Sequence, residues 1–452
     1  MTRHVAVIDI GKTNAKLALV DLATSSEVAL RRIANAPVLD GPYPHHDVEL
    51  LSSFILDSLA EINREQRIEA ISITTHGATG VLVDAAGELA LPVLDYEFAG
   101  PDALAKDYDT IRPAFAETGT PRLPVGLNLG AQLFWQQKHF PAEFARAAAM
   151  LTYPQYWALR LTGVAANEVT SLGCHTDLWN PWKADFSSLV DTMQWRQLMA
   201  PVRPAKDRLG PILPALATRT GLDAQTPVFC GLHDSNASLL PHLLSDKPPF
   251  SVVSTGTWVV SMAVGGNKVT LDPARDTLVN VNALGDPVPS ARFMGGREFS
   301  LLTDGQSEDW TDDDVATVLA RKTSLLPSTQ LGSGPFPHHR AAWLNADGIN
   351  NGQRFAAISF YLALMTATCL DLIGADGPTI VEGPFARNRL FTRMLAAATA
   401  RAVIASEAAT GTSIGAALLA SDHGTAQGKG EMIEPPTDSA WRDYAKAWQR
   451  SV

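Results

Sequence analysis

One arrangement of residues occurs twice in this chain, at its beginning and again past its middle. Residues 5–20, VAVIDIGKTNAKLALV, and residues 250–264, FSVVSTGTWVVSMAV, each consist of an apolar run, a short turn with Gly and Thr, and a second apolar run. This pattern predicts two strands joined by a tight turn, which is a β-hairpin. The repetition indicates two related halves, each with a turn whose oriented backbone amides could hold phosphate.

The first turn contains Gly11-Lys12-Thr13, a triplet that also ends the nucleotide-binding P-loop. A P-loop has the form G-x-x-x-x-G-K-[ST] and continues into a helix. In this chain Ala6 stands where the first Gly is required, and the apolar run up to Val20 is typical of a strand. The sequence therefore excludes a P-loop, although a hairpin turn can still bind phosphate through amides, Lys and hydroxyl groups.

Strands and helices alternate along the rest of the chain. Strands are expected at residues 70–75, 80–84 and 378–382 and from Pro227, and helices at 50–63, across 131–161 with a break at Pro141, and at 389–400. This alternation is typical of an α/β protein. Because 452 residues exceed what one hydrophobic core usually organises, we expect two domains, residues 1–244 and 245–452, with a linker at 245–249.

Composition limits the partners and the compartment. With 36 Lys and Arg against 47 Asp and Glu, the net charge of −11 argues against a nucleic acid or an anionic membrane as partner. Cys174, Cys230 and Cys369 are odd in number and widely spaced, which indicates a reducing compartment and neither a disulfide framework nor a zinc site. The early first strand leaves no room for a signal peptide, and no apolar run suggests a membrane span. We therefore expect a cytoplasmic protein.

Several short motifs follow one another in a fixed order. They are Asp9–Asn14, Thr75–Gly77, Leu161–Gly163, Gly231–Asp234, Ser254–Trp258 and Gly383–Asn388. In this order and spacing the sequence resembles the FGGY family of carbohydrate kinases, which shares a duplicated ATPase fold with actin and heat-shock chaperones. The resemblance covers nearly the whole chain. It implies an α/β fold of two duplicated ribonuclease H-like (actin-like ATPase) domains with a central cleft, in which ATP and Mg²⁺ meet a small sugar substrate.

The resemblance also implies roles for the two turns. Asp9 would hold Mg²⁺ through water, and the β- and γ-phosphates would be surrounded by Gly11, Lys12, Thr13, Asn14 and Lys16. From the second domain, phosphate would be contacted by Thr255, Gly256 and Thr257, and the adenosine would be bordered by Gly383, Phe385 and Asn388. Such residues suffice because phosphoryl transfer depends on positioning and charge neutralisation. The alternatives are an exposed strand charge for Lys16 and a core side chain for Phe385.

Asp234 is the expected catalytic base, since a carboxylate at a strand end can accept the proton of the attacking hydroxyl. The alternative is a helix N-cap, because Asp-Ser-Asn precedes an apolar run. Sugar contacts are expected from His76, Gly77, Asp95, Glu97, His233 and Asp234 itself, with Gln132 and Trp135 as further candidates.

Two segments depart from the family pattern. The turn at Glu382–Ala386 reads Glu-Gly-Pro-Phe-Ala, whereas relatives typically carry three glycines, so the nucleotide preference stays open. The segment Pro92–Phe98 contains Asp95, Tyr96 and Glu97 but lacks the Arg that many relatives carry there. The identity of the sugar depends on this segment and stays open too.

The motifs Ser254–Trp258 and His233–Ser235 are most similar to the rhamnulokinase and fuculokinase branches. This similarity favours a ketose such as L-rhamnulose or L-fuculose, phosphorylated at its terminal hydroxyl, acted on by a monomer or homodimer. A shorter ketose or polyol, such as xylulose, ribulose or erythrulose, is the alternative substrate. The rival functions are a nucleotide-dependent binding protein that hydrolyses ATP and a sugar-sensing homologue without kinase activity.

Overall fold

The computed structural model describes residues 2–406, 411–421 and 430–452. The chain forms two compact units: unit 1 comprises Met1–Ser245, Val279–Pro287 and Thr410–Gln427, and unit 2 comprises Asp246–Leu278, Val288–Ala409 and Gly428–Val452. Two segments of the second half therefore belong to unit 1. The predicted division at residue 244 places both of them in the second domain. That division stays a prediction about the functional domains.

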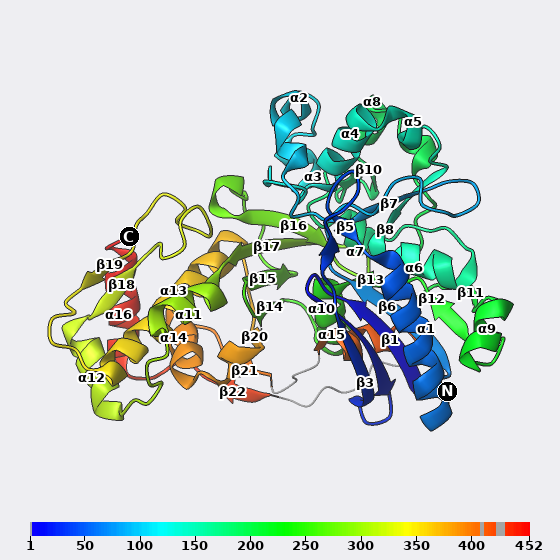
Figure 1. The fold of residues 1–452 in the computed structure, drawn as a ribbon. Helices are drawn as coiled ribbons and strands as arrows, with labels where there is room; N and C mark the ends of the chain where they lie inside the picture. Colours follow the sequence, from blue (N-terminus) through cyan, green and yellow to red (C-terminus); the bar gives the residue numbers. More distant parts are fainter. Residues whose placement is uncertain (1, 407–410, 422–429) are drawn as a thin grey trace. The chain divides into compact units, whose positions relative to one another are not determined.

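The sheet of unit 1 has the strand order β11-β12-β6-β1-β2-β3, with β13 also pairing with β6 (Figure 1). Its strands are β1 (His4–Ile10), β2 (Asn14–Asp21), β3 (Ser26–Ala34), β6 (Ala70–Thr75), β11 (Arg208–Pro211), β12 (Pro227–Phe229) and β13 (Leu232–His233). The first three strands form an antiparallel meander, whereas β6 is parallel to β1, and β12 and β13 are parallel to β6. The predicted first hairpin is therefore confirmed.

Helices cover both faces of this sheet (Figure 1). Ala6, Ile8 and Ile10 of β1 share a core with α1 (Val48–Glu65) and α6 (Tyr153–Thr162). The alternate residues Val5 and Val7 share a second core with α10 (Asp234–Ser245) and α15 (Gly411–Leu418). Because successive side chains of a strand point to opposite faces, a strand covered on both sides is apolar throughout, which explains the continuous run in the sequence.

The region between residues 129 and 162 differs from its prediction. The structure has α4 (Leu129–His139), α5 (Pro141–Phe144), β8 (Ala149–Thr152) and then α6. The expected helix after Pro141 is therefore wrong at Ala149–Thr152, which pairs antiparallel with β7 (Gly80–Val83). A short apolar run fits strand and helix alike, and here pairing with a distant strand decides the outcome.

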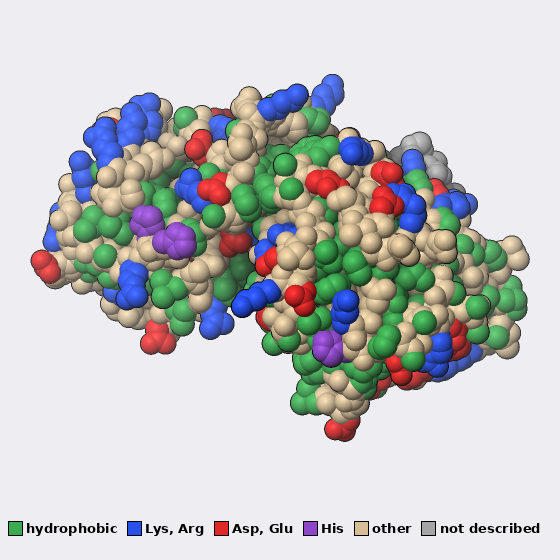
Figure 2. Space-filling view, turned by 90° about the horizontal axis from the view of Figure 1, so that it is seen from above, with side chains coloured by type: hydrophobic (Ala, Val, Ile, Leu, Met, Phe, Trp, Pro, Cys, Tyr) green, Lys and Arg blue, Asp and Glu red, His purple; other side chains and the backbone are tan. Residues whose placement is uncertain are grey.

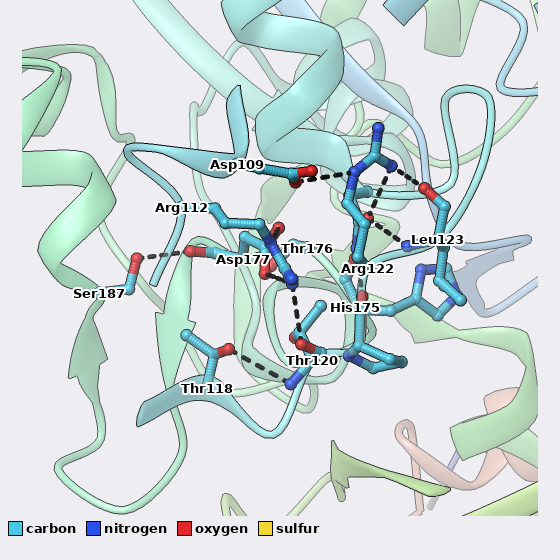
Figure 3. Close-up of polar contacts among 12 residues, drawn as sticks. Asp109, Arg112, Thr118, Thr120, Arg122, Leu123, His175, Thr176, Asp177 and Ser187 are labelled. Atoms are coloured by element: carbon cyan, nitrogen blue, oxygen red, sulfur yellow. Dashed lines mark hydrogen bonds and ion pairs between the residues drawn. The ribbon is translucent and has the colours of Figure 1, made fainter. Parts of the chain in front are cut away.

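A buried ion pair organises the outer part of unit 1 (Figure 3). The Asp177 side chain is fully buried, and it accepts hydrogen bonds from Nη2 of Arg112 at 2.9 Å and from the Tyr108 hydroxyl at 2.8 Å. Arg112 Nη2 also donates to the backbone oxygen of Thr120 at 2.9 Å. Burial raises the pKa of Asp177, and Arg112 opposes that rise. The network ties the loop at Asp177 to the segment that contains Tyr108 and Arg112.

The remaining elements of unit 1 are short. They are β4 (Pro37–Val38), β5 (His45–His46), η1 (Gly100–Leu104), α2 (Ala105–Asp109), α3 (Phe115–Thr118), α7 (Val169–Leu172), β9 (Trp179–Asn180), β10 (Asp185–Phe186), α8 (Ser188–Thr192), η2 (Arg196–Leu198) and α9 (Pro214–Thr220).

The sheet of unit 2 repeats the arrangement of unit 1, with the order β16-β17-β15-β14-β20-β21-β22. Its strands are β14 (Phe250–Thr255), β15 (Val259–Val264), β16 (Thr277–Val281), β17 (Pro287–Phe293), β20 (Thr379–Glu382), β21 (Val403–Ala405) and β22 (Glu431–Ile433). The end of β16, from Val279, and the first residue of β17, Pro287, are counted in unit 1. As in unit 1, an antiparallel hairpin and a third strand lie beside parallel strands reached through helices. The predicted α/β fold with duplicated domains is confirmed.

The core of unit 2 is built around one long apolar helix, α13 (Asn351–Leu372). By length and composition α13 could cross a membrane, but 83% of its most apolar window is buried within the protein, as in the core helix of a globular unit. Its neighbours are η3 (Pro273–Arg275), α11 (Gly295–Thr303), α12 (Asp312–Arg321), β18 (Ser324–Leu326), β19 (Ala342–Leu344), η4 (Pro384–Arg387), α14 (Arg389–Thr399) and α16 (Ser439–Gln449).

Charged side chains of both signs occur across the face drawn in Figure 2, among apolar and neutral polar ones. Basic residues do not form a continuous surface on that face, in keeping with the net charge of −11.

Candidate active site

The predicted residues of unit 1 meet at one edge of its sheet. The parallel strands β1, β6 and β13 are neighbours, with Asp9 opposite Thr74 and His233 opposite Thr75. Parallel strands bring their carboxyl ends together, and these ends are where α/β sheets usually bind ligands. Asp9, His76 and the pair His233–Asp234 therefore lie close together although they are far apart in the sequence.

Asp9 and Lys16 form a cross-strand ion pair in the first hairpin. They are direct partners in the β1–β2 register, and Lys16 Nζ lies 3.0 Å from Asp9 Oδ2. Burial raises the pKa of Asp9 to about 6, Lys16 opposes the rise, and the negative charge of Asp234 adds to it. Asp9 is therefore a buried carboxylate whose charge is balanced by one lysine.

The turn between β1 and β2 is held by a residue that the sequence analysis missed. Gly11 donates its amide to the Asn14 oxygen at 2.9 Å, which closes the turn. The buried Asn35 donates through Nδ2 to the Gly11 oxygen at 2.7 Å and through its amide to the Thr13 oxygen at 2.9 Å. Thr13 and Asn14 are exposed. Asn35 thus fixes the backbone of the turn, while Thr13 and Asn14 stay exposed, as a phosphate-binding turn requires.

Lys12 does not point to the same side as Lys16. Its Nζ lies 2.6 Å from Oδ1 of Asp95 and 3.3 Å from Oε2 of Glu97. The structure therefore joins a residue expected on the phosphate side to two residues expected on the sugar side.

His76 and His233 each offer a hydrogen-bond acceptor. His76 Nδ1 lies 2.9 Å from the Gly77 oxygen, and His233 Nε2 lies 3.1 Å from Oδ1 of Asp234. Because those oxygens only accept, these nitrogens carry the protons. The other nitrogens, His76 Nε2 and His233 Nδ1, are buried without a partner in the described part of the chain. Burial lowers the pKa of His76 and lowers that of His233 to about 4, which favours the neutral form of both rings.

Gly77 is required by the approach of His233. A Cβ atom on Gly77 would lie 2.8 Å from His233 Nε2, closer than two non-bonded atoms come. Any larger residue would displace the imidazole that contacts Asp234.

Asp234 is the first residue of α10, and about a third of its side chain is exposed (33%). Its Oδ1 accepts from the amide of the next residue, Ser235, at 2.6 Å, and not from the later amides that an N-cap side chain binds. Surrounding protein raises the pKa of Asp234, and the nearby His76 opposes that rise. The carboxylate is thus partly open and more basic than an ordinary Asp, as a general base needs to be.

A buried carboxyl group that the sequence analysis missed supports this segment. The hydroxyl of Thr170 accepts from the amide of His233 at 2.9 Å, and it donates to Oε2 of Glu168. Oε2 also accepts from the Thr170 amide at 2.9 Å. Burial raises the pKa of Glu168 to about 7. No local sequence pattern indicates this connection, because it joins α7 to β13.

Aromatic rings lie beside His76. His46 and Tyr153 were also missed, and their rings lie 5.2 Å from the ring of His76. Trp135, a further candidate, packs instead among Tyr43, Phe98 and Phe140. Gln132 donates through Nε2 to the Ala78 oxygen at 2.6 Å and thereby holds a loop.

Unit 2 contains a pocket of about 790 Å³. It is lined by Thr255, Gly256, Thr257, Gly296, Arg297, Phe299, Ser300, Glu308, Trp310, Phe355, Pro384, Phe385, Arg387, Asn388 and Arg389. The structure thus brings the predicted Thr255–Thr257 turn together with Phe385 and Asn388, whereas Gly383 is not among the lining residues. Gly296 and Arg297 at the start of α11 were not predicted, because the only signal there was two glycines after a strand.

The turn after β20 is rigid, and its side chains have structural contacts of their own. The Thr255 hydroxyl accepts from the amide of Phe385 at 3.1 Å and donates to the Glu382 oxygen. Gly383 has a φ of 82°, and a Cβ there would lie 2.1 Å from the Thr255 oxygen, so only Gly fits. Asn388 is the N-cap of α14, accepting from the amides of Leu390 and Phe391. This turn therefore offers mainly its backbone and shape to a ligand.

Phe385 is both a core side chain and part of the pocket wall. It is 5% exposed and packs against Phe299 and Phe391, with ring centroids 5.6 Å and 5.1 Å away. It also lines the pocket, so its edge can contact a flat ligand group.

The described residues contain no group of three or more His, Cys, Asp or Glu that could hold a metal ion by itself. Mg²⁺ usually binds through one or two carboxylates and takes its other ligands from phosphate and water. A single buried carboxylate such as Asp9 at an open turn fits that manner of binding.

Comparison with known proteins defines the class. Residues 4–241 match the N-terminal domain of the FGGY family of carbohydrate kinases, and residues 247–429 match the C-terminal domain of carbohydrate kinase FGGY. The chain therefore belongs to the FGGY carbohydrate kinases, and the resemblance seen in the motifs is confirmed.

Particular relatives are similar to different extents. A carbohydrate kinase from Novosphingobium aromaticivorans is 39% identical, with a TM-score of 0.92 over 100% of this chain and 98% of its own. A xylulose kinase from Lactobacillus acidophilus is 15% identical, with a TM-score of 0.80 over 99% of this chain and 97% of its own, and shows a shared fold. L-fuculokinase from Salmonella typhi is 27% identical over 271 residues, which are 58% of this chain and 57% of that protein. The chain thus spans little more than half the length of the curated relatives it matches.

Proposed function

We propose that this protein is a kinase that transfers the γ-phosphate of ATP to a terminal hydroxyl of a neutral ketose. The observation that carries the proposal is the Asp234 carboxylate, partly open and more basic than usual, beside two neutral histidines that each have an unpartnered nitrogen. A carboxylate can take a proton from a hydroxyl, and the imidazole nitrogens can accept hydrogen bonds from other hydroxyls of the same molecule. An ATPase without a sugar substrate would not need those acceptors.

In the proposed reaction the sugar hydroxyl oxygen attacks the γ-phosphorus while Asp234 accepts the hydroxyl proton, and ADP leaves with the bridging oxygen. Asp9 would hold Mg²⁺, which neutralises phosphate charge when bound. Gly11, Thr13, Asn14 and Lys16 would contact the phosphates through turn amides, side-chain donors and charge. Lys16 forms an ion pair with Asp9, so its ammonium already lies beside the carboxylate that would hold Mg²⁺.

We further propose that the pocket of unit 2 binds the nucleotide. Its volume of about 790 Å³ suits a ligand of that size, and its walls combine Phe and Trp rings with three arginines. Aromatic rings can contact a purine, and arginines and turn amides bind phosphate. A glycerol kinase of Plasmodium falciparum, solved with ADP, shares the fold at a TM-score of 0.82, which supports an adenine nucleotide as a ligand of this chain.

The partial match to L-fuculokinase supports a six-carbon deoxyketose such as L-fuculose or L-rhamnulose as substrate. Structural neighbours also include a xylulose kinase and a gluconate kinase, so shorter ketoses and a sugar acid are the alternatives to test. The three cysteines are buried and none of them is in a disulfide, and cysteines of this kind are typical of a reducing compartment such as the cytoplasm.

The test is ADP release in a coupled assay with ATP, Mg²⁺ and a panel of L-fuculose, L-rhamnulose, xylulose, ribulose, erythrulose, glycerol and gluconate. At least one neutral sugar should stimulate ADP release strongly over the rate without sugar. Asp234→Asn should lower kcat by about 10²- to 10⁴-fold while ATP binding, measured by calorimetry, stays nearly unchanged. If no sugar stimulates release, the ATP-hydrolysing or sugar-sensing alternatives replace this proposal.

A further inference from the structure

The two lysines of the first hairpin serve different neighbours. Lys16 lies on β2 opposite Asp9 and forms an ion pair with it at 3.0 Å. Lys12 lies in the turn, and its Nζ is 2.6 Å from Asp95 and 3.3 Å from Glu97. The motif implies phosphate binding for both lysines. Only Lys16 contacts Asp9, the residue expected to hold Mg²⁺ beside the phosphates.

The surroundings of Lys12 are those of the proposed sugar site. Its ammonium lies 5.2 Å from the centre of the Tyr96 ring, and that ring lies 5.4 Å from the ring of His76. The positive charge of Lys12 also contributes to lowering the pKa of His46 and of His76. The ammonium is therefore close to the histidine whose Nε2 is unpartnered, although it comes from the phosphate-side turn.

Hydrogen-bond capacity shows what this ion pair can still bind. A lysine ammonium has three N–H donors, of which one is hydrogen-bonded to Asp95 Oδ1 at 2.6 Å, while Glu97 forms an ion pair with the ammonium at 3.3 Å. Asp95 uses Oδ1 for Lys12 and for the amide of Glu97, while its Oδ2 has no hydrogen-bond partner among the residues that the structure describes. Among the described residues, the pair thus presents at least one free donor beside one free acceptor.

We propose that Lys12 and Asp95 together bind two neighbouring hydroxyls of the sugar, so that Lys12 determines sugar specificity instead of holding phosphate. One hydroxyl oxygen accepts from Lys12 Nζ, and the adjacent hydroxyl donates to Asp95 Oδ2. This inference rests on the proposed kinase function and names the part of the substrate that this site reads.

The charges define the chemical class of the substrate. The Lys12 ammonium stands against two carboxylates, of which the Asp95 side chain is 4% exposed and the Glu97 side chain 67% exposed. The net charge of this group is negative, which disfavours a sugar that carries a carboxylate of its own. The site therefore fits a neutral ketose or polyol with adjacent hydroxyls.

The test separates the two substrates kinetically. Lys12→Met should raise KM for the preferred neutral sugar by about 10- to 100-fold, the range expected for a lost hydrogen bond to a charged group, and leave KM for ATP within about threefold. Lys16→Met, on the same hairpin, is the matched control and should raise KM for ATP more than KM for the sugar. Gluconate should be a much poorer substrate of the wild-type chain than the neutral sugar.

Some results would overturn the inference. If Lys12→Met raises KM for ATP more than KM for the sugar, Lys12 binds phosphate and the inference is wrong. If neither KM changes, Lys12 has no role in binding either substrate. Should Lys12→Met not fold, Lys12→Arg keeps the charge but changes the donor geometry, and its sugar KM should rise while its ATP KM does not. Asp95→Asn combined with Lys12→Met should weaken sugar binding by less than the product of the single effects.

Failure of the kinase proposal is distinguishable from failure of this inference. If the wild-type chain phosphorylates none of the sugars, the kinase proposal fails, and calorimetry with L-fuculose and xylulose then tests Lys12 by binding alone. Sugar binding that Lys12→Met weakens supports the inference without turnover. Sugar binding that Lys12→Met leaves unchanged, or no binding at all, overturns it.

Discussion

The buried Glu168 should make the stability of unit 1 depend on pH in a way that one substitution removes. Its pKa rises from 4.5 to about 7 in the folded chain because burial disfavours the charged form. Between these values the unfolded chain loses the proton and the folded chain keeps it, so the unfolded state is favoured as pH rises. The contribution of Glu168 is therefore present below the unfolded pKa and is lost as pH rises toward the folded pKa.

The magnitude follows from the two pKa values. Each pKa unit corresponds to about 1.4 kcal/mol, so unit 1 should lose about 2 to 3 kcal/mol of stability between about pH 5 and pH 8 through this group. Glu168→Gln cannot titrate, and its amide oxygen can still accept from the Thr170 amide and hydroxyl. Relative to wild type, the variant should therefore gain about 2 to 3 kcal/mol over the same range.

Hydrogen exchange read by mass spectrometry is a suitable assay, because peptides from β1 and β6 report the opening of unit 1 separately from unit 2. Comparing variant and wild type at each pH cancels the pH dependence of the exchange chemistry. Glu65→Gln is the control, since Glu65 is 60% exposed at the end of α1 and pairs with Arg31 at 2.8 Å. The difference in stability between Glu65→Gln and wild type should not change with pH. Parallel curves for Glu168→Gln and wild type would refute the reasoning.

Three further predictions concern the two turns and the outer part of unit 1. Gly383→Ala should destabilise unit 2 by about 1–3 kcal/mol and weaken ATP binding, because a Cβ there would lie 2.1 Å from the Thr255 oxygen; thermal unfolding and ATP calorimetry check this, and an unchanged affinity contradicts it. Asp177→Ala should cost about 3–5 kcal/mol in urea unfolding, since it leaves the Arg112 charge without its partner; a loss below about 1 kcal/mol would show that water replaces the pair. The acid limb of kcat/KM should have its midpoint above the ordinary Asp value of 3.8, because the pKa of Asp234 is raised and the base acts only when ionised; a pH–rate profile with a midpoint at or below that value excludes Asp234 as the base.

Much of the fold could be predicted because its pattern is local. The hairpins at Val5–Val20 and Phe250–Val264 are marked by two apolar runs around a Gly turn, and β1 is apolar from Val5 to Ile8 because helices cover both of its faces. Ala149–Thr152 was wrongly predicted as helix, because a short apolar run does not by itself distinguish a strand from a helix.

The site was less predictable because its contacts are long-range. Motifs located Asp9, His76 and Asp234, but the direction of Lys12 depends on Asp95, which lies in a loop far along the chain. Asn388 was expected beside adenosine; it lines the pocket of unit 2, and its side chain also caps α14, a role that any Asn before a helix can take. Glu168 carries no motif and is connected to His233 only through Thr170.

The position of α15 has a consequence for how this protein can be made and divided. Ala416 and Leu418 of this helix complete the core over Val5 and Val7, which precede the helix by most of the sequence. During synthesis, that face of the sheet stays uncovered until most of the chain has been translated. A fragment cut at the linker would lack the same cover, so expression of residues 1–245 alone should yield an aggregation-prone product.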